Sequence, residues 1–290
     1  MDSRIEMKPA GILYVVATPI GNREDITLRA LRILETVDTV AAEDTRVTRR
    51  LLSYHEIDKP MISYHEHNED DRAPQLIHRL TKGESLALVS NAGTPSVSDP
   101  GYRLIKTAIA ENIRVVPIPG VSAVISALSG AGIPTDRFVF IGFLPKKPGK
   151  RKKELSDLAT EKGTMVFYES PKRIIDFMKG LIPFFGDRYA VLSREMTKPH
   201  EEFIRGQLSD IVYSLSQRST VKGECTLLVS GAENEKTVSI DTVAGELQAL
   251  IIEGEDTLSQ IVKTVSKKYN ISKKIVYDKA LEIDRARGQI

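Results

Sequence analysis

The sequence predicts an α/β protein in which two α/β domains form a ligand cleft and a small all-α tail follows. Three observations predict it. Short apolar segments alternate with amphipathic ones in the first half, strand-like segments at hairpin spacing follow, and only helical periodicity remains after residue 237. Uniformly apolar strands joined by amphipathic helices are typical of a parallel sheet covered on both faces. We expect a Rossmann-like parallel sheet in residues 1–130, a mixed sheet in 131–235 and a helix-turn-helix-like tail in 240–290.

The first half alternates strand and helix in the order that a parallel sheet requires. Strands are expected at 11–19, 38–44, 60–65, 85–90 and 114–120, and helices at 25–37, 45–55, 71–83, 99–112 and 121–132. Asp25 is the expected N-cap of the first helix, whose Leu28, Leu31 and Leu34 fall on one face. Asp99 followed by proline is typical of a helix start, so we expect Asp99 to be a cap.

The second half begins after a break at residues 130–136, which contain two glycines and a proline and where we place the domain hinge. Strands are then expected at 137–143, 163–170, 189–195, 201–208 and 223–231, with helices near 152–161, 171–181 and 208–217. A hairpin across residues 198–200 makes the second sheet mixed. In the tail, Thr257 and Ser272 are expected to cap two helices with apolar faces formed by Leu258, Ile261, Val262 and Val265, and by Ile275, Val276, Ala280 and Leu281.

Composition excludes several classes of protein. The net charge is only +2, so any argument for a polyanionic partner must be local. The single cysteine, Cys225, excludes an internal disulfide framework and a cysteine-based zinc site. The first residues lack a signal-peptide core and no apolar run reaches membrane-spanning length, so we expect a cytoplasmic protein without a membrane partner. His65 and His67 lack a third ligand nearby, and we expect no metal.

The stretch Ala87 to Leu104, ALVSNAGTPSVSDPGYRL, places small, hydroxyl and Pro/Gly residues directly after an apolar strand. Ligands of open parallel sheets bind beyond the carboxyl ends of the strands, where glycine lets the backbone approach closely. The stretches ATPIGN, AEDTR and PGVSA follow other strands in the same way, which predicts a pocket floor. Neither a Walker sequence nor GxGxxG is present, which disfavours nucleoside triphosphates and dinucleotides. Each loop taken alone also fits ordinary turn chemistry.

Eight stretches together resemble one known family. They are LYVVATPIGNREDITLRAL, AEDTRVTRRLL, ALVSNAGTPSVSDPGYRL, VVPIPGVSA, FIGFLPKK, FYESPKRI, SREMTKPHEE and GECTLLVSG, within about the first 230 residues. They resemble the tetrapyrrole methylase fold family, and more closely its ribosomal RNA branch. The resemblance implies S-adenosyl-L-methionine in the cleft, a homodimer, and 2'-O-methylation of a cytidine ribose in small-subunit (16S) rRNA.

Two departures from the wider family bear on the substrate. Members that act on tetrapyrroles usually carry a glycine-rich first loop where this chain has ATPIGN, and an aspartate where it has Asn91. Both departures disfavour porphyrin-like substrates and fit the RNA branch.

The resemblance also implies which residues hold the cofactor. A neutral pocket rich in backbone groups suits a sulfonium zwitterion, whose methyl group is already activated without a metal. The implied cofactor-binding residues are Pro19, Ser90, Asn91, Ala92, Gly93, Ser96, Ser122, Ala123, Tyr168, Cys225, Thr226 and Leu227.

The active-face motifs implied by the resemblance are AEDTR, FYESPKR and REMTKPHEE. Methyl transfer requires the acceptor hydroxyl in line with the sulfur–methyl bond, and a general base would help as its proton becomes acidic. Arginines and lysines there would grip phosphate or orient ribose, and glutamates would act as base or orienter. Plain salt bridges explain the Arg194-Glu195 and Glu169-Arg173 pairs equally well. The catalytic candidates are Glu43, Arg46, Glu169, Arg173, Arg194 and Glu195.

Two basic segments favour a nucleic-acid partner, and we expect RNA instead of DNA because the α/β body resembles a methyltransferase. The stretch KKPGKRKK, residues 146–153, has six basic residues in eight and is expected to be a mobile loop. From Lys263 to the end, eight basic residues stand against three acidic ones. The alternatives are a solvated helix entry for the first segment and a helical pair that only packs on the body for the second. The RNA-binding candidates are Lys146, Lys147, Lys150, Arg151, Lys152, Lys153, Lys273 and Lys274.

Two other functions stay open beside 16S rRNA methylation. One is methylation of a cobalamin or siroheme precursor, and the other is a non-catalytic RNA-binding role in ribosome assembly. A basic segment and an appended helical unit indicate a large, structured target, so we expect an assembled or nearly assembled small subunit as the substrate.

Overall fold

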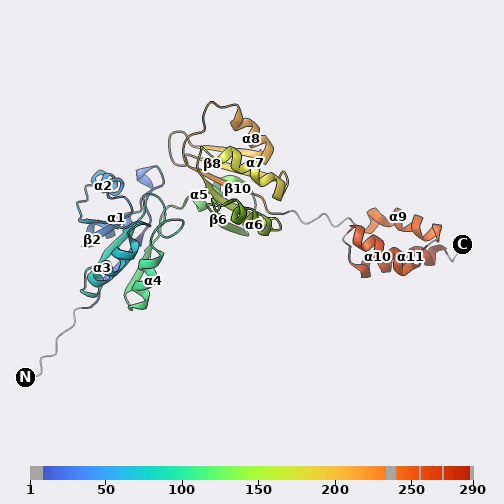
Figure 1. Ribbon diagram of the computed structural model, residues 1–290, viewed down its shortest axis with the longest axis horizontal. Coiled ribbons are helices and arrows are strands. Elements are labelled where there is room, and N and C mark those ends of the chain that lie inside the picture. The colour runs from blue at the N-terminus through green and yellow to red at the C-terminus, as the bar shows by residue number, and fades with distance from the viewer. Residues whose placement is uncertain (1–8, 233–239, 255, 270, 288–290) are drawn as a thin grey trace, which may run out of the picture. The chain divides into compact units, whose positions relative to one another are not determined.

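The computed structural model describes residues 9–232, 240–254, 256–269 and 271–287 of the chain (Figure 1). The chain divides into two compact units, residues 1–232 and 233–290, which are described separately. The boundary expected at residue 235 and the start of the chain lie outside the described residues. None of the described helices is long and apolar enough to cross a membrane.

The first sheet is parallel throughout, as predicted. Its strands lie in the order β3-β2-β4-β1-β5, with bounds β1 Ile12–Val16, β2 Thr39–Ala42, β3 Met61–Ser63, β4 Leu86–Val89 and β5 Arg114–Ile118. In the centre, Leu13 of β1 lies beside Leu86 of β4 and Val115 of β5. The carboxyl ends of all five strands therefore meet at one edge, from which the loops predicted to bind a ligand leave.

Helices cover both faces of this sheet. The bounds are α1 Leu28–Thr36, α2 Thr45–Tyr54, α3 Glu69–Thr81 and α4 Tyr102–Ala110. Leu34 of α1 and Leu52 of α2 pack with Val40 and Ala87 on one face, while Leu76 of α3 packs on the other. Side chains alternate along a strand, so each face has its own apolar core.

Two predicted helix starts are wrong, for related reasons. Asp25 ends a short 3-10 turn instead of capping α1; the cap is Thr27, whose hydroxyl accepts the Ala30 N–H at 3.1 Å. The later start leaves Leu28 86% exposed instead of on the core face. Asp99 does not cap α4 either, because the left-handed backbone of Gly101 (φ 140°) delays the helix to Tyr102.

The second sheet is mixed, as predicted. Its order is β6-β7-β10-β8-β9, with bounds β6 Phe138–Gly142, β7 Thr164–Glu169, β8 Tyr189–Arg194, β9 Glu202–Gln207 and β10 Cys225–Val229. β6 pairs parallel with β7, and all other neighbours are antiparallel. β8 and β9 form the hairpin expected across residues 198–200.

Different helices cover the two faces of the second sheet. On one face, α6 Pro148–Leu158, α7 Ile174–Phe185 and α8 Leu208–Ser216 surround a core that includes Phe167 and Phe177. On the other face, α5 Ala123–Ala131 packs through Val124 and Leu128 against Val166 and Val191. The helix α5 follows directly from β5 of the first sheet, yet it packs as a layer on the second sheet.

The prediction that residues 146–153 form a mobile basic loop is wrong from Pro148 onward, because α6 begins there. Proline at the first helical position is favoured, since its missing N–H would have no partner there. Lys150, Lys152 and Lys153 therefore lie exposed on the first turns of a helix, which is the alternative that the sequence left open.

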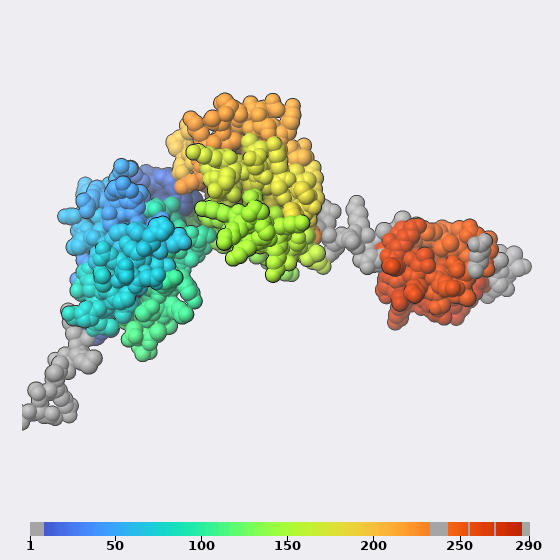
Figure 2. All heavy atoms as spheres, in the orientation of Figure 1, coloured from blue at the N-terminus to red at the C-terminus, as the bar shows by residue number. Residues whose placement is uncertain are grey.

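The C-terminal unit is helical, with α9 Ile240–Glu253, α10 Leu258–Tyr269 and α11 Lys273–Arg287 (red in Figure 2). It has an apolar core of its own, in which Leu247, Val265 and Ala280 are fully buried. Most of the predicted inner face is confirmed, but Ile275 is 49% exposed.

Candidate active site

A cavity of about 360 Å³ lies between the two sheets of the first unit, at the carboxyl edge of the parallel one. Its walls come from the loop after β4, the start of α5, the loop after β6, the end of β7 and the start of β10. The lining residues are Ile20, Ala92, Gly93, Thr94, Val97, Ser98, Asp99, Ser122, Ala123, Phe143, Tyr168, Glu169, Ser170, Pro171, Met196, Glu224, Cys225 and Thr226.

The loop after β4 is held in place by the strand next to it. Thr18 donates its N–H to the Gly93 carbonyl at 2.8 Å, and Gly93 returns its N–H to the Thr18 carbonyl at 2.9 Å. Gly93, Ser96 and Ser98 all have positive φ (74°, 69° and 61°), which lets the chain turn tightly toward the cavity. The loop thus offers a fixed backbone wall.

Asp99 is a lining residue that sequence analysis missed, because its position before proline was interpreted as a helix cap. Burial, and then the nearby charge of Glu43, raise the pKa of Asp99 to about 6, while a hydrogen bond with Ser90 opposes that rise. A carboxyl group with a pKa near neutrality, in a cavity, is typical of a functional position.

The opposite wall is aromatic and apolar. The Tyr168 ring makes edge contacts with Phe140 and Phe143, at centroid distances of 5.1 and 5.6 Å. Burial, followed by the charge of Asp99, raises the pKa of Tyr168 to about 12, so its phenol stays protonated. Burial likewise raises the pKa of the Cys225 thiol to about 11, which makes it a neutral lining group instead of a nucleophile.

Glu169 is the one catalytic candidate that lines the cavity. Its Oε1 accepts the Ser170 N–H at 2.6 Å and two N–H groups of Arg173 at 2.9 and 2.6 Å. Arg173 itself is exposed at the cavity's side. Glu169 and Arg173 therefore form a salt bridge, as the alternative interpretation predicted. The same bonds also fix the Glu169 carboxylate beside the cavity.

Glu43 is hydrogen-bonded to the loop after β4, which forms one wall of the cavity. Its carboxylate accepts the Asn91 N–H at 3.0 Å, and the Asn91 side-chain oxygen accepts the Asp44 N–H at 3.1 Å. These two bonds tie the start of α2 to the loop after β4. Asn91 thus has a structural partner on α2.

Arg194 and Glu195 lie in ion-pair networks. Arg194 donates to Glu202 at 2.6 Å and to the Lys222 carbonyl at 3.0 Å. Glu195 accepts from Lys198 at 2.9 Å, and that hydrogen bond lowers the pKa of Glu195. The structure therefore brings Glu169 to the cavity with Arg173 bonded to it, and places Arg46 on α2 and Arg194 and Glu195 in these networks.

The predicted cofactor residues divide into two groups. Ala92, Gly93, Ser122, Ala123, Tyr168, Cys225 and Thr226 line the cavity, whereas Pro19, Ser90, Asn91, Ser96 and Leu227 do not. Leu227 is fully buried in the core under α7, because its side chain points to the other face of β10 from Thr226. The apolar lining residues Ile20, Val97, Phe143 and Met196 were missed, since nothing in their sequence distinguishes them from core residues.

The predicted RNA-binding residues lie on two surfaces. Lys146 and Lys147 precede α6, and Arg151 is half buried, with its guanidinium 5.3 Å from the centre of the Phe177 ring. Lys273 and Lys274 are exposed at the start of α11 and border a hollow with Lys263 of α10. Among the described residues, no group of three His, Cys, Asp or Glu side chains is placed to hold a metal ion.

Comparison with proteins of known sequence gives strong similarity. The chain is 47% identical over 221 residues to Ribosomal RNA small subunit methyltransferase I of Halalkalibacterium halodurans, covering 76% of each chain. Proteins of the same name from Synechocystis sp. and Streptococcus pyogenes are 43% and 44% identical, covering 94% of this chain and 99% and 95% of theirs.

Solved structures share the fold at lower identity. Cobalt precorrin-4 methyltransferase CbiF is 20% identical with a TM-score of 0.58, covering 76% of this chain and 94% of its own. Uroporphyrin-III C-methyltransferase of Thermus thermophilus, in complex with S-adenosylhomocysteine, is 18% identical with a TM-score of 0.57, covering 75% and 97%. The family described as Tetrapyrrole (Corrin/Porphyrin) Methylases matches residues 12–212. The chain therefore belongs to the tetrapyrrole methylase family and, within it, groups with relatives named Ribosomal RNA small subunit methyltransferase I.

Proposed function

We propose that this protein transfers a methyl group from S-adenosylmethionine to the ribose 2'-hydroxyl of a cytidine in 16S rRNA. The observation that carries the proposal is the cavity at the carboxyl edge of the parallel sheet, in a chain whose relatives are named rRNA methyltransferases. The nucleotide and the sugar position come from the family resemblance.

The lining of the cavity fits the cofactor. A volume of about 360 Å³ is within the range of small-molecule sites. The backbone of Ala92, Thr94 and residues 122–123 offers hydrogen-bonding groups, and Ile20, Val97 and Phe143 offer an apolar wall for an adenine ring. The Asp99 carboxylate favours a ligand that carries positive charge.

S-adenosylmethionine supplies an activated methyl group, so the protein has to position the acceptor and remove one proton. A ribose hydroxyl is a weak nucleophile, and positioning contributes much of the acceleration. Glu169 is held rigidly by Ser170 and Arg173 and suits the role of orienter. Asp99, with a pKa of about 6, is largely ionised at neutral pH and suits the role of proton acceptor.

The partners follow from the chemistry of the acceptor. An assembled or nearly assembled small ribosomal subunit is the expected substrate, approached by the basic residues of α6 and α11. We also expect a homodimer, as the resemblance implies, and a cytoplasmic location, where such a subunit would be met. Neither DNA nor a membrane is expected as a partner.

One transfer assay separates this function from its alternatives. Purified protein with methyl-labelled S-adenosylmethionine is offered small subunits, free 16S rRNA and uroporphyrinogen III in parallel. We expect label in the RNA, located by nuclease digestion and mass spectrometry at a cytidine ribose. Label in the porphyrinogen alone would establish the tetrapyrrole function. If the protein binds RNA but not the cofactor, only a non-catalytic role in ribosome assembly would remain.

A further inference from the structure

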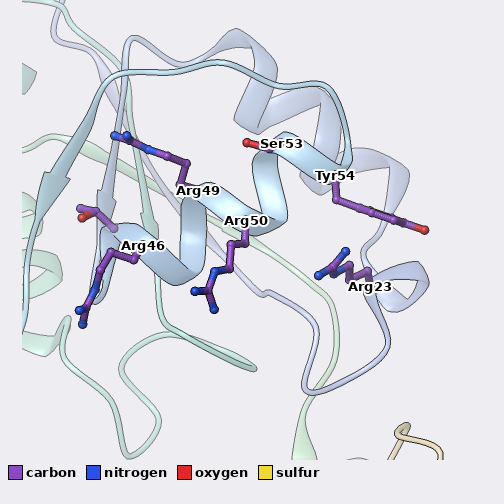
Figure 3. A pocket seen from close by; sticks show the side chains of 7 residues that line it. Arg23, Arg46, Arg49, Arg50, Ser53 and Tyr54 are labelled. Carbon is purple, nitrogen blue, oxygen red and sulfur yellow. The ribbon is translucent and has the colours of Figure 1, made fainter.

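A second hollow, of about 610 Å³, lies on α2 outside the cavity and is here called the arginine groove. Figure 3 shows Arg46 and Arg50 extending to the same side of the helix, and Arg23 reaching toward Tyr54 from the 3-10 turn between β1 and α1. Residues three, four and seven apart share a helix face, which explains why one short helix supplies most of the lining. The lining residues are Arg23, Thr45, Arg46, Arg49, Arg50, Ser53 and Tyr54.

The charges of the groove are not neutralised by the fold. None of its seven lining residues carries a carboxylate. Within the described part of the chain, Arg49 and Arg50 have no ion pair, and Arg23 instead lies with its guanidinium 4.8 Å from the centre of the Tyr54 ring. Arg46 pairs with Asp44, yet its side chain stays 85% exposed. Grouping like charges costs free energy, so an external anion is the natural partner.

Other arginines of the same unit behave differently. Arg194 and Arg218 both bind Glu202, at 2.6 Å each. Arg173 binds Glu169, also at 2.6 Å. These arginines are paired within the fold, whereas Arg23, Arg49 and Arg50 of the arginine groove form no ion pair with any residue that the structure describes.

The groove also adjoins the cavity. The helix that carries it begins at Thr45, directly after the residue whose N–H donates to Asn91 in the cavity loop. Glu43, the residue before that, is close enough to Asp99 for its charge to raise the pKa of that lining carboxyl. A strand of substrate lying along α2 would thus lead toward the reacting centre.

We propose that the arginine groove binds the phosphodiester backbone of the RNA substrate, and that Tyr54 stacks on an unpaired base. The inference rests on the proposed function and names the surface that presents the acceptor strand. Guanidinium groups bind phosphate oxygens bidentately, and about 6 Å of helix between Arg46 and Arg50 suits two successive phosphates. Tyr54 is 51% exposed, and exposed aromatic rings are the usual stacking platforms for single-stranded RNA.

The test compares two double variants that remove the same charge. Arg49→Gln with Arg50→Gln neutralises the groove and keeps helix propensity. Lys82→Gln with Arg114→Gln is the matched control, because both residues are exposed and lie at the amino ends of β4 and β5, the opposite edge of the sheet. Affinity for small subunits and for free 16S rRNA is measured across a salt series, with calorimetry of S-adenosylmethionine as a check on folding.

The groove variant should lose roughly tenfold in RNA affinity and show a shallower salt dependence by about 1.5, the value for two lost phosphate contacts. Its cofactor affinity should match wild type. Tyr54→Ala should weaken RNA binding by roughly 1 kcal/mol, which is about fivefold, without changing the salt slope.

An equal loss in the control variant would show a general field effect and overturn the proposal. Unchanged RNA affinity in the groove variant would overturn it too, while methyl transfer by wild type would keep the proposed function. Absence of transfer to RNA by wild type would instead overturn the proposed function itself.

Discussion

The cavity between the sheets is less open than the arginine groove on α2 and is lined mainly by small, neutral and apolar groups, whereas the groove is lined by four arginines. The Asn91 N–H donates to Glu43, and the Asn91 side-chain oxygen accepts the Asp44 N–H, so the cavity loop is bonded to the start of α2. The two regions are therefore neighbours with opposite chemistry. A compact donor needs shape, backbone contacts and exclusion of water. A polyanionic acceptor needs exposed cations that act over several charges. On the proposed function, this difference would let one sheet edge separate donor and acceptor by solvent exposure and charge.

Salt concentration should give the largest difference between the two regions, because it should change RNA affinity and cofactor affinity to very different extents. With about four phosphate contacts in the arginine groove, RNA affinity should fall roughly 100-fold between 50 and 200 mM KCl at fixed magnesium. Cofactor affinity should change less than about twofold, because the cavity is shielded from the ions. Filter binding and calorimetry across the series check both. Parallel salt slopes for RNA and cofactor would contradict the division.

Filling the cavity should give the next largest effect. Ala123→Phe places a ring among the lining residues, and overpacking of this kind costs about 1–3 kcal/mol, or roughly 5- to 150-fold in cofactor affinity. Ile125→Phe is the control, since Ile125 is on the same helix and 55% exposed. Calorimetry with S-adenosylmethionine measures both variants. Equal affinities in the two would remove the cavity from the cofactor site.

Truncation of the chain after Ala232 should have a smaller effect, and it should separate RNA binding from cofactor binding. The helical unit has its own core and contributes exposed lysines, so its loss should weaken RNA binding roughly tenfold and leave the cavity intact. Electrophoretic mobility shifts and calorimetry follow the two affinities. A collapse of cofactor affinity would mean that the tail supports the first unit.

Substitution of Asp99 should produce the smallest effect on stability and binding. The direction in which this effect changes with pH follows from the raised pKa of Asp99. Because burial raises the pKa of Asp99 to about 6, the folded chain holds this proton more tightly than the unfolded chain. The contribution to stability is complete below the ordinary pKa of 3.8 and is lost as pH rises through about 6. Asp99→Asn removes the cost of an ionised buried group, so its Tm relative to wild type should be higher at pH 8 than at pH 4.5.

The same substitution should also act on the cofactor. Loss of the carboxylate should weaken S-adenosylmethionine binding a few-fold at pH 8, because the positive ligand loses an anionic neighbour. Scanning fluorimetry and calorimetry provide the two readouts. Asp136→Asn is the control, since Asp136 is exposed. A Tm difference that does not vary with pH would contradict the burial of the Asp99 charge.

The fold was largely predictable because apolar strands and amphipathic helices carry local signals. Both sheet types and the β8–β9 hairpin followed from those patterns. Helix starts were less predictable, as Asp25 and Asp99 show, since a good capping residue can be displaced by a competing cap or a left-handed glycine.

The loop residues of the site were predictable from the sequence, whereas its apolar lining residues were not. Gly93 and Ala123 stand in recognisable strand-end loops, whereas Val97, Phe143 and Met196 reach the cavity only through tertiary packing. Leu227 shows the converse: it stands beside Thr226 in the sequence, but strand alternation turns it into the core. Charge pairing was equally impossible to predict, because nothing in the sequence shows that Arg194 pairs with Glu202 while Arg50 pairs with no carboxylate among the described residues.

The central claim is that the cavity at the carboxyl edge of the parallel sheet holds the methyl donor. A crystal structure of the protein with S-adenosylmethionine tests this directly. We expect the ligand against the backbone of residues 92–94 and 122–123, with its adenine toward Phe143 and Tyr168. A ligand found at any other place on the chain, or this cavity closed by the protein's own side chains at saturating ligand, would contradict the account.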